Sequence, residues 1–449
     1  MFEQPQKPKT TDWLKESVTF KLIFICVLAL VLLIPSVFIQ NLISERAVRQ
    51  EEVISKVSDT WSGSQQVNGP VLVIPYKKNE NYIDTSRRQT VRQVIDYLYI
   101  LPDGLNYKAN VKGELLHRGI FKVVVYNTDI KVSGNFSKTD ISALGIASDQ
   151  LMLDKAIITF GVSDLKGLKN NPVIKAAGQS LNSEPSYSDQ SVFENGLQAR
   201  INLTNVTDNA FTFNYDLQLK GSQQLYFLHL GKVTDVQSAG NWATPSFDGR
   251  YLPDDRKVDK NGFSAKWRML YYNRPFPQQW VGDSHLLDDK KKQADATFGI
   301  KLQLPVDEYQ KTMRTSKYSL LIILLSFISL FLTELIGKQK VHAFNYILIG
   351  AAMVIYYTLL LSFSEQIGFN WAYLVASGAT ICLISVFIAS LLKNKKAAAL
   401  FALILSVFYT FIFVIIQLED LALMVGSVAL FIIIAILMYV SRRIDWDKQ

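Results

Sequence analysis

The chain has 449 residues, of which 49% are hydrophobic and only 19% are charged, and its mean hydropathy is positive at +0.14. This composition excludes a disordered, collagen-like or disulfide-scaffold protein and favours a membrane protein that also carries a large water-soluble part. Lys and Arg outnumber Asp and Glu by 47 to 39, which gives a net charge of +8. In a membrane protein such an excess of positive charge first indicates basic cytoplasmic segments. Binding of nucleic acid is the less favoured interpretation.

The first long apolar run is Leu22–Ile39, which contains no charged residue. At 1.5 Å per residue it gives roughly 27 Å of helix, close to the thickness of the hydrocarbon layer. It is too long for the core of a signal peptide, and no small-residue cleavage pattern follows it. We therefore expect an uncleaved anchor over residues 22–40, preceded by a tail of residues 1–21.

Five further apolar runs follow one another closely near the C-terminal end, each of about 19 to 22 residues, the length of one spanning helix. They are Tyr318–Ile336, Phe344–Phe363, Trp371–Leu392, Ala398–Gln417 and Leu421–Val440. The sequence therefore predicts an α-helical bundle of six spans in a 1+5 arrangement, with five of them in residues 318–440.

Basic residues alternate along the segments that join these spans. Lys and Arg occur in the N-terminal tail, after the second and fourth spans and in the tail 441–449, whereas the loops after the third and fifth spans have none. Because cytoplasmic loops carry the excess of Lys and Arg, we expect both termini in a bacterial cytoplasm and residues 41–317 in the periplasm. Cys26 and Cys382 lie in predicted spans, which excludes a disulfide framework in the periplasmic segment.

Residues 41–317 have the pattern of a β-rich soluble domain. Runs such as Ile300–Leu304 alternate apolar and polar residues, and turn residues separate them. We expect a large all-β domain, either one sandwich or two packed units with a possible boundary near 177–191. Helical spacing in residues 42–57 and 306–318 predicts stalks at both ends, the second of which should continue directly into span two.

The charge of this segment is ordinary for a soluble surface. It holds 35 Lys and Arg and 30 Asp and Glu, once the 12 and 9 elsewhere in the chain are subtracted from the totals. No basic run has interleaved aromatics, so no nucleic acid partner is expected. The expected partners are the lipid bilayer and an envelope protein, lipid or glycan, and the sequence does not indicate an oligomeric state.

The block between Trp242 and Trp267 is aromatic and rich in Gly and Pro. Trp242, Phe247 and Trp267 are candidates for a groove that binds lipid, glycan or peptide, and Arg250 and Lys266 are candidates for meeting an anion there. The favoured alternative is a long ordered turn whose aromatic side chains pack into the core.

Polar residues near the membrane form the second candidate group. Glu334 and Glu365 are the only acids inside spans two and three, and ionisable groups in a bilayer often mark ion or proton paths. Both lie near predicted helix ends, which favours interfacial anchoring instead. Arg314 and Lys317 are expected at headgroup level, and His342 lies in the loop after span two.

Catalytic and metal motifs are missing from the sequence. No two of the four histidines have the spacing of a helical metal site, and there is no G-x-S-x-G, P-loop or H-E-x-x-H motif. We therefore predict a non-enzymatic protein with no catalytic residue, metal or cofactor. One alternative is a transporter or lipid-handling protein that uses polar side chains in the bundle, such as Tyr356, Tyr357, Thr358 and Ser385. Another is an enzyme acting on cell-wall or lipid substrates around Trp242–Trp267.

Short stretches spread over nearly the whole chain carry a family resemblance. The most specific begins at Asn241-Trp242, passes through Pro245-Ser246-Phe247 and ends at Trp267. Others are Leu33-Ile34-Pro35, Glu45-Arg46-Ala47, Ser62-Gly63, Gly69-Pro70, Arg118-Gly119-Ile120-Phe121, Ser364-Glu365 and Ile444-Asp445-Trp446. Together they resemble the CreD family of bacterial inner-membrane envelope-integrity proteins.

The resemblance implies an inner-membrane protein whose expression answers envelope stress and whose loss weakens the envelope, with no established catalytic residue. The chain departs from the expected family pattern at Ala243-Thr244 and Ala343, where Pro-His and Pro would be expected. The missing histidine argues against a general metal ligand or base in this motif. We expect the periplasmic domain to bind an envelope component or partner and so to support envelope integrity.

Overall fold

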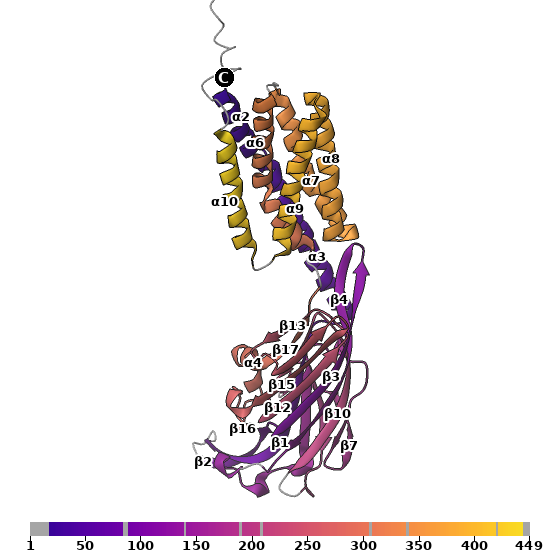
Figure 1. The fold of residues 1–449 in the computed structure, drawn as a ribbon. Helices are drawn as coiled ribbons and strands as arrows, with labels where there is room; N and C mark the ends of the chain where they lie inside the picture. Colours follow the sequence, from indigo (N-terminus) through magenta and orange to yellow (C-terminus); the bar gives the residue numbers. More distant parts are fainter. Residues whose placement is uncertain are drawn as a thin grey trace, which may run out of the picture. The chain divides into compact units, whose positions relative to one another are not determined.

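The computed structural model describes residues 18–83, 89–138, 141–187, 191–206, 210–304, 308–337, 341–418 and 421–442. These form two compact units (Figure 1). One is a β-rich domain, Glu52–Pro305, and the other is a helical unit made from Met1–Glu51 and Val306–Gln449. Most of the predicted N-terminal tail and nearly all of the C-terminal tail lie outside the described residues.

Helices form the second unit, and most of them are apolar. They are α2 (Val18–Val31), the part of α3 (Leu33–Trp61) up to Glu51, the polar α5 (Glu308–Lys317), α6 (Ser319–Gly337), α7 (Ala343–Ile367), α8 (Phe369–Leu392), α9 (Lys395–Gln417) and α10 (Ala422–Ser441). Within the described residues, four helices are long and apolar enough to cross a membrane, namely Phe20–Trp61, α7, α8 and α9. If the bent pair α5 and α6 counts as one span, the number of candidate spans is five. Only Ala422–Ile436 of α10 passes as a shorter apolar helix, so six spans are not confirmed.

The predicted stalks have different outcomes. Residues 42–57 lie within the continuous helix α3. The second stalk does not run directly into span two, because α5 and α6 meet at a bend of 43° around Tyr318. The side chains of Thr315 and Ser316 donate hydrogen bonds to the carbonyls of Lys311 and Met313, both at 2.8 Å. Such bonds from Ser and Thr to the preceding turn bend helices, and they explain the break.

Two sheets make the β domain. Sheet A has the order β13-β17-β11-β1-β5-β9-β8, with β2 paired to β1 and β16 paired to β2. Its strands are β1 (Gln65–Ile83), β2 (Gln89–Ile100), β5 (Ala156–Val162), β8 (Glu184–Pro185), β9 (Gly196–Ile201), β11 (Gln224–Leu228), β13 (Pro245–Gly249), β16 (Gln279–Val281) and β17 (Thr297–Leu302).

Sheet B has the order β14-β15-β12-β3-β4-β10-β6-β7. Its strands are β3 (Gly104–Arg118), β4 (Phe121–Phe136), β6 (Val173–Ala176), β7 (Gln179–Asn182), β10 (Phe211–Ser222), β12 (Val233–Gly240), β14 (Asp255–Asp259) and β15 (Gly262–Leu270). A short helix, α4 (Lys290–Ala296), precedes β17. The possible boundary near 177–191 does not divide the domain, because β7 and β8 carry the chain there from sheet B to sheet A.

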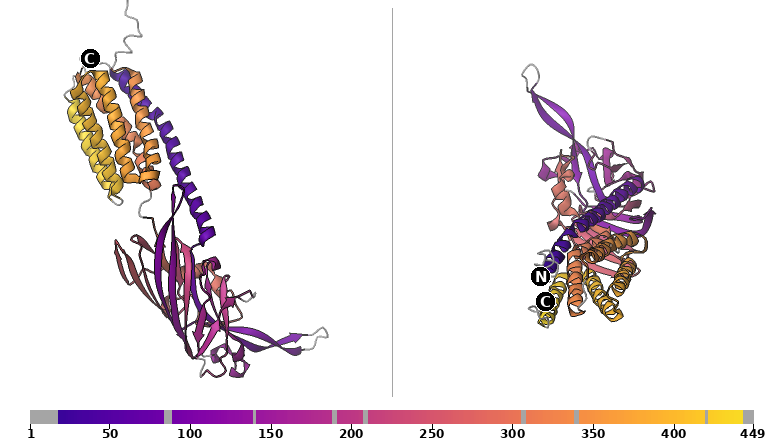
Figure 2. Two further views of the ribbon diagram at one scale, coloured as in Figure 1. Left: turned by 90° about the vertical axis from the view of Figure 1, so that its right-hand side faces the viewer. Right: turned by 90° about the horizontal axis from the view of Figure 1, so that it is seen from above.

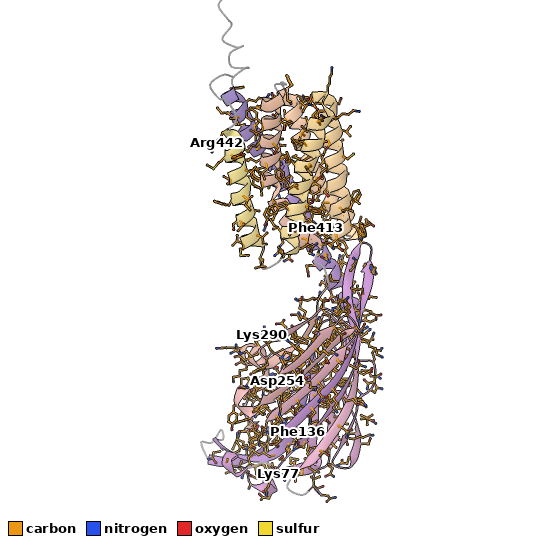
Figure 3. The ribbon with its side chains drawn as sticks, in the orientation of Figure 1. Lys77, Phe136, Asp254, Lys290, Phe413 and Arg442 are labelled. Carbon is orange, nitrogen blue, oxygen red and sulfur yellow. The ribbon has the colours of Figure 1, made fainter. Side chains whose placement is uncertain are left out.

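The two sheets share one core, so the domain is a single sandwich. In β10 and β15 buried and exposed residues alternate, which buries one face of the sheet. Aromatic rings meet across the sheets: Tyr107 lies 5.1 Å from Phe227, and Phe160 lies 4.6 Å from Tyr215. Figure 3 labels Phe136, another fully enclosed member of this core. Burial of this much apolar surface is what stabilises the domain.

Asp164 and Gln65 fix the junction where the chain passes from α3 into the first strand. One Asp164 oxygen accepts hydrogen bonds from Ser62 Oγ and the Gly63 amide, both at 3.1 Å. Burial acts to raise the pKa of Asp164, but these bonds and the Lys166 amide outweigh it and lower that pKa. The fully buried Gln65 amide donates to Ser62 Oγ and to the Asp164 carbonyl at 2.9 and 2.8 Å.

The outer parts of β1 and β2 form a two-stranded arm that projects from the body of the domain (Figure 2). Val91 and Ile95 on this arm are 67% and 57% exposed. An isolated hairpin of this kind is only marginally stable in water, so the arm has little packing support.

Acid should destabilise the domain through His229. Its Nδ1 lies 2.9 Å from Thr234 Oγ1 and its Nε2 lies 3.2 Å from the Leu270 carbonyl, which can only accept, so Nε2 carries the proton. Burial lowers the pKa of His229 from 6.5 to about 4. As the pH falls, the imidazole in the unfolded chain therefore becomes protonated before the imidazole in the folded chain. The free energy of unfolding decreases as the pH drops from 6.5 towards 4. We expect a loss of about 2 kcal/mol at pH 5 relative to pH 7.

Thermal unfolding of the detergent-solubilised chain, followed by tryptophan fluorescence between pH 5 and 7, measures this effect. The control is His229→Gln, which cannot be protonated and should flatten the pH dependence. An equally steep dependence in that variant would assign it to other groups.

Candidate functional site

The block that contains the candidate binding residues connects the open edges of the two sheets. β13 is an edge strand of sheet A, β14 is an edge strand of sheet B, and residues 250–254 join them. Gly249 ends β13 with φ +98°, and a Cβ there would lie 2.5 Å from the Thr297 carbonyl, so only glycine fits. The chain can therefore turn from one sheet edge to the other.

The two tryptophans belong to the core. Trp267 is 2% exposed, its indole donates to the Tyr251 carbonyl at 3.1 Å, and its ring lies 5.7 Å from that of Phe298. Trp242 is 8% exposed and donates to the Gln303 carbonyl at 2.8 Å. Neither ring is available to stack on a ligand, in line with the favoured alternative of packed aromatics.

The two candidate cations lie on the surface in ion pairs. Arg250 Nε is 3.8 Å from Asp295 Oδ1, and Lys266 Nζ is 3.4 Å from Asp255 Oδ2. All four side chains are largely exposed, so these pairs contribute little to stability. The structure does not bring Arg250 and Lys266 together with the tryptophans into one pocket.

A shallow groove of about 440 Å³ lies beside these residues, between β13 and β14. It is lined by Pro245, Ser246, Phe247, Arg256 and Val258. Of the residues predicted from the sequence, only Phe247 lines it. Its ring is half-buried and packs edge-on against Trp267 at 5.9 Å, which holds it in place.

Arg256 is the residue of this groove that sequence analysis missed. Arg256 is exposed, but it pairs with the buried Ala265 and so lies on the side of β14 that faces the groove, whereas its neighbour Lys257 pairs with the exposed Ser264. Among the described residues no acidic side chain is within ion-pairing distance of Arg256. A guanidinium without an acidic partner, beside the rings of Pro245 and Phe247, can bind a carboxylate or phosphate.

Glu334 is the centre of a buried polar cluster in the helical unit. It is 7% exposed, forms an ion pair with Lys21 of α2, and accepts hydrogen bonds from the Val341 amide at 3.0 Å and the Tyr346 hydroxyl at 3.1 Å. Lys21 also donates to the Val341 carbonyl at 2.8 Å. The cluster connects α2, α6 and α7. We call these contacts of Glu334 with Lys21, Val341 and Tyr346 the Glu334 bracket, because they hold three helices together.

The other polar candidates lie apart from Glu334. Glu365 near the end of α7 accepts a hydrogen bond from the Tyr309 hydroxyl at 2.9 Å and lies 4.0 Å from Arg46 Nε. His342 caps the start of α7, where its Nδ1 accepts from the Phe344 amide at 3.3 Å. Arg314 is half-buried and Lys317 is exposed, both in α5.

Tyrosines cluster inside the helical unit. The rings of Tyr356 and Tyr409 are 4.8 Å apart, Tyr357 packs against Tyr356 at 4.8 Å, and the Tyr373 hydroxyl donates to the Tyr409 carbonyl at 2.7 Å. Within the described part of the chain the hydroxyls of Tyr357 and Tyr409 have no hydrogen-bond partner. Of the polar span residues named from the sequence, Thr358 is exposed instead.

Among the described residues no group of three or more His, Cys, Asp or Glu side chains could hold a metal ion. The fold and these sites define a multi-pass membrane protein in which a β-sandwich is inserted between an N-terminal apolar helix and a C-terminal helical region. Comparison with known proteins identifies the family within this class. The family model described as inner membrane protein CreD matches residues 17–447.

The chain therefore belongs to the CreD family of inner membrane proteins. It is similar to the inner membrane protein CreD of Escherichia coli K12, with 28% identity over 434 residues, which cover 96% of this chain and 94% of that protein. The family resemblance expected from the sequence is confirmed.

Substitution of Glu334 tests the bracket. Glu334→Ala removes the partner of Lys21 and two further hydrogen bonds, and we expect it to lower the free energy of unfolding by about 3 to 5 kcal/mol. Glu334→Gln keeps one acceptor oxygen, which can serve the Val341 amide or the Tyr346 hydroxyl but not both, and should cost about 1 to 3 kcal/mol. Thermal unfolding in detergent measures both.

Glu365→Gln is the matched control, because Glu365 has a more distant cation and should respond less. If Glu334→Gln and Glu365→Gln both leave the unfolding midpoint unchanged, the bracket contributes nothing to stability.

Proposed function

We propose that this protein is a non-enzymatic, multi-pass inner-membrane protein with both termini in the cytoplasm and the β domain in the periplasm. In this proposal the domain binds an envelope protein and thereby supports envelope integrity under stress. The placement of the domain is supported by the basic segments that alternate along the predicted loops. The proposed role in envelope integrity rests on what the resemblance to the family implies.

One observation carries the binding proposal: a groove of mixed polar and apolar lining at the open edge of the sandwich holds a guanidinium without an ion pair in the described structure. The groove is open and shallow, which suits an extended segment of a protein better than an enclosed small molecule. An apolar side chain of the partner would rest against Phe247 and Val258, and an acidic side chain would pair with Arg256.

Arg256 has a competing structural role. Charged side chains on edge strands are one way in which sheets avoid pairing with other sheets. That role requires no ligand and predicts aggregation on loss of the charge, whereas a binding role predicts loss of a defined partner and a soluble protein.

Photocrosslinking from the groove distinguishes these roles. With p-benzoylphenylalanine in place of Val258, we expect a defined protein adduct in cells, and Arg256→Glu should reduce it by about tenfold or more, since a lost charge-assisted hydrogen bond costs ~1.5 to 3 kcal/mol. The same variant should reproduce the sensitivity of a deletion strain to detergent and lysozyme.

The matched control is the adjacent Lys257, on the opposite face of β14. A probe at Lys257 should capture no specific partner, and Lys257→Glu should leave the Val258 adduct intact. A lipid or glycan adduct, or an adduct indifferent to Arg256→Glu, contradicts the proposed partner. Unchanged sensitivity on deletion of the gene contradicts the proposed role.

A second candidate function is transport or lipid handling by the helical unit. It is favoured by the buried hydroxyls of Tyr357 and Tyr409, which lack partners within the described residues. An unsatisfied buried hydroxyl is costly to stability, so a protein that keeps one often uses it.

The double variant Tyr357→Phe, Tyr409→Phe separates this candidate from a purely structural cluster. If the hydroxyls only pack, removing them should raise the free energy of unfolding by about 1 kcal/mol per group and leave complementation of a deletion strain intact. If they serve transport, complementation should be lost while the protein remains folded. Thermal unfolding and growth on detergent plates give the two readouts.

A further inference from the structure

The β3–β4 hairpin extends beyond the rest of sheet B as a two-stranded ribbon. Pairing of β3 with β12 ends at Val111, and pairing of β4 with β10 ends at Val125, whereas β3 and β4 continue to pair up to Arg118 and Phe121 (Figure 1). At about 3.4 Å per residue, the ribbon reaches roughly 20 Å beyond β12.

The tip of this ribbon combines apolar and basic side chains. Leu115 is 38% exposed, and Ile120 and Phe121 are half-buried. Arg118 is exposed and Lys122 is half-buried beside them. Apolar side chains flanked by long cationic ones are typical of segments that lie at the headgroup level of a bilayer.

The N-terminal connection to the membrane-spanning helices lies at the base of this ribbon. Ile54 and Val57, in the last turns of α3, pack in one cluster with Val123 and Val125 of β4. Four residues after Ile54, Ser58 Oγ meets Ser222 Oγ at 2.8 Å, and Ser222 pairs with Val125. Going back along α3 from Ser58 therefore leads from the base of the ribbon towards its tip.

The C-terminal connection lies at the same base. Asn241 brackets the backbone of Gly113, accepting from its amide at 2.8 Å and donating to its carbonyl at 3.2 Å. The Trp242 ring packs against Gly113 so closely that a Cβ would lie 2.8 Å from it, and Leu302 lies 3.5 Å from the same point. Trp242 also holds Gln303, close to the end of the domain. Both connections thus leave the domain at the end that carries the ribbon.

We propose that the β3–β4 tip binds the anionic surface of the bilayer. Leu115 and Ile120 would enter the boundary between headgroups and acyl chains, and Arg118 and Lys122 would meet lipid phosphates. The argument rests on the register of the ribbon, its composition and the position of both chain connections, and it is independent of the groove between β13 and β14. Anionic headgroups attract such cations with a strength that salt reduces.

A fluorescent probe at the tip tests this proposal in the full chain. Cys26 and Cys382 are replaced by Ser, Ile120 by Cys, and the thiol is labelled with an environment-sensitive dye in lipid nanodiscs. We expect blue-shifted emission, quenched by headgroup spin-labelled lipid, in discs that contain phosphatidylglycerol. High salt, or Arg118→Glu with Lys122→Glu, should reverse it, each lost cation weakening the contact about fivefold.

The matched control is a label at Ser180 of β7. Ala176 at the start of the β6–β7 turn pairs with Phe213, nine residues and roughly 30 Å along β10 from Ser222, so this label lies at the far end of the domain. Its emission should be that of a dye exposed to water, whatever the lipid composition of the nanodisc. Emission at Ile120 that matches Ser180 overturns the proposal. So does a blue shift that spin-labelled lipid does not quench, because a protein surface would then cover the tip.

Discussion

The organisation of the β domain depends on one constraint, which is that its chain must enter and leave at the same end. The flanking helices α3 and α5 lead to the apolar helices α2 and α6, so the sandwich between them has to begin and finish near one edge. Gln65 at the start of β1 pairs with Leu225, and Lys301 near the end of β17 pairs with Gln224. The first and last strands therefore lie on the two sides of one short strand, β11.

Two sets of polar contacts hold this end of the domain in place. Asp164 and Gln65 fix the incoming chain at Ser62 and Gly63, and Trp242 fixes the outgoing chain at Gln303. These positions include several that carry the family resemblance. Trp242, one of the sequence candidates for a binding groove, is thus packed in the core, whereas Phe247, another candidate, and Arg256 line the groove on which the proposed function rests.

Local sequence patterns predicted much of the secondary structure. Uninterrupted apolar runs predicted the helices α7, α8 and α9 within a few residues, and the alternation at Ile300–Leu304 predicted a strand that overlaps β17, because both patterns depend on neighbours along the chain. Pairings between distant residues could not be predicted in this way. Lys21 and Glu334 are 313 positions apart, and the side of β14 on which Arg256 lies follows from its register with Ala265. The bend at Tyr318 arises from side-chain hydrogen bonds that hydropathy does not register.

The place of β17 in sheet A has a consequence for biogenesis. This strand lies between β13 and β11, yet it is the last strand to be synthesised. Until residues 297–302 have been synthesised, β13 and β11 lack the partner strand that later lies between them, and such unpaired edges are prone to aggregation. Sheet A can therefore be completed only after the rest of the domain has been synthesised, and the yield of folded protein depends on how long the nascent domain avoids aggregation before that point.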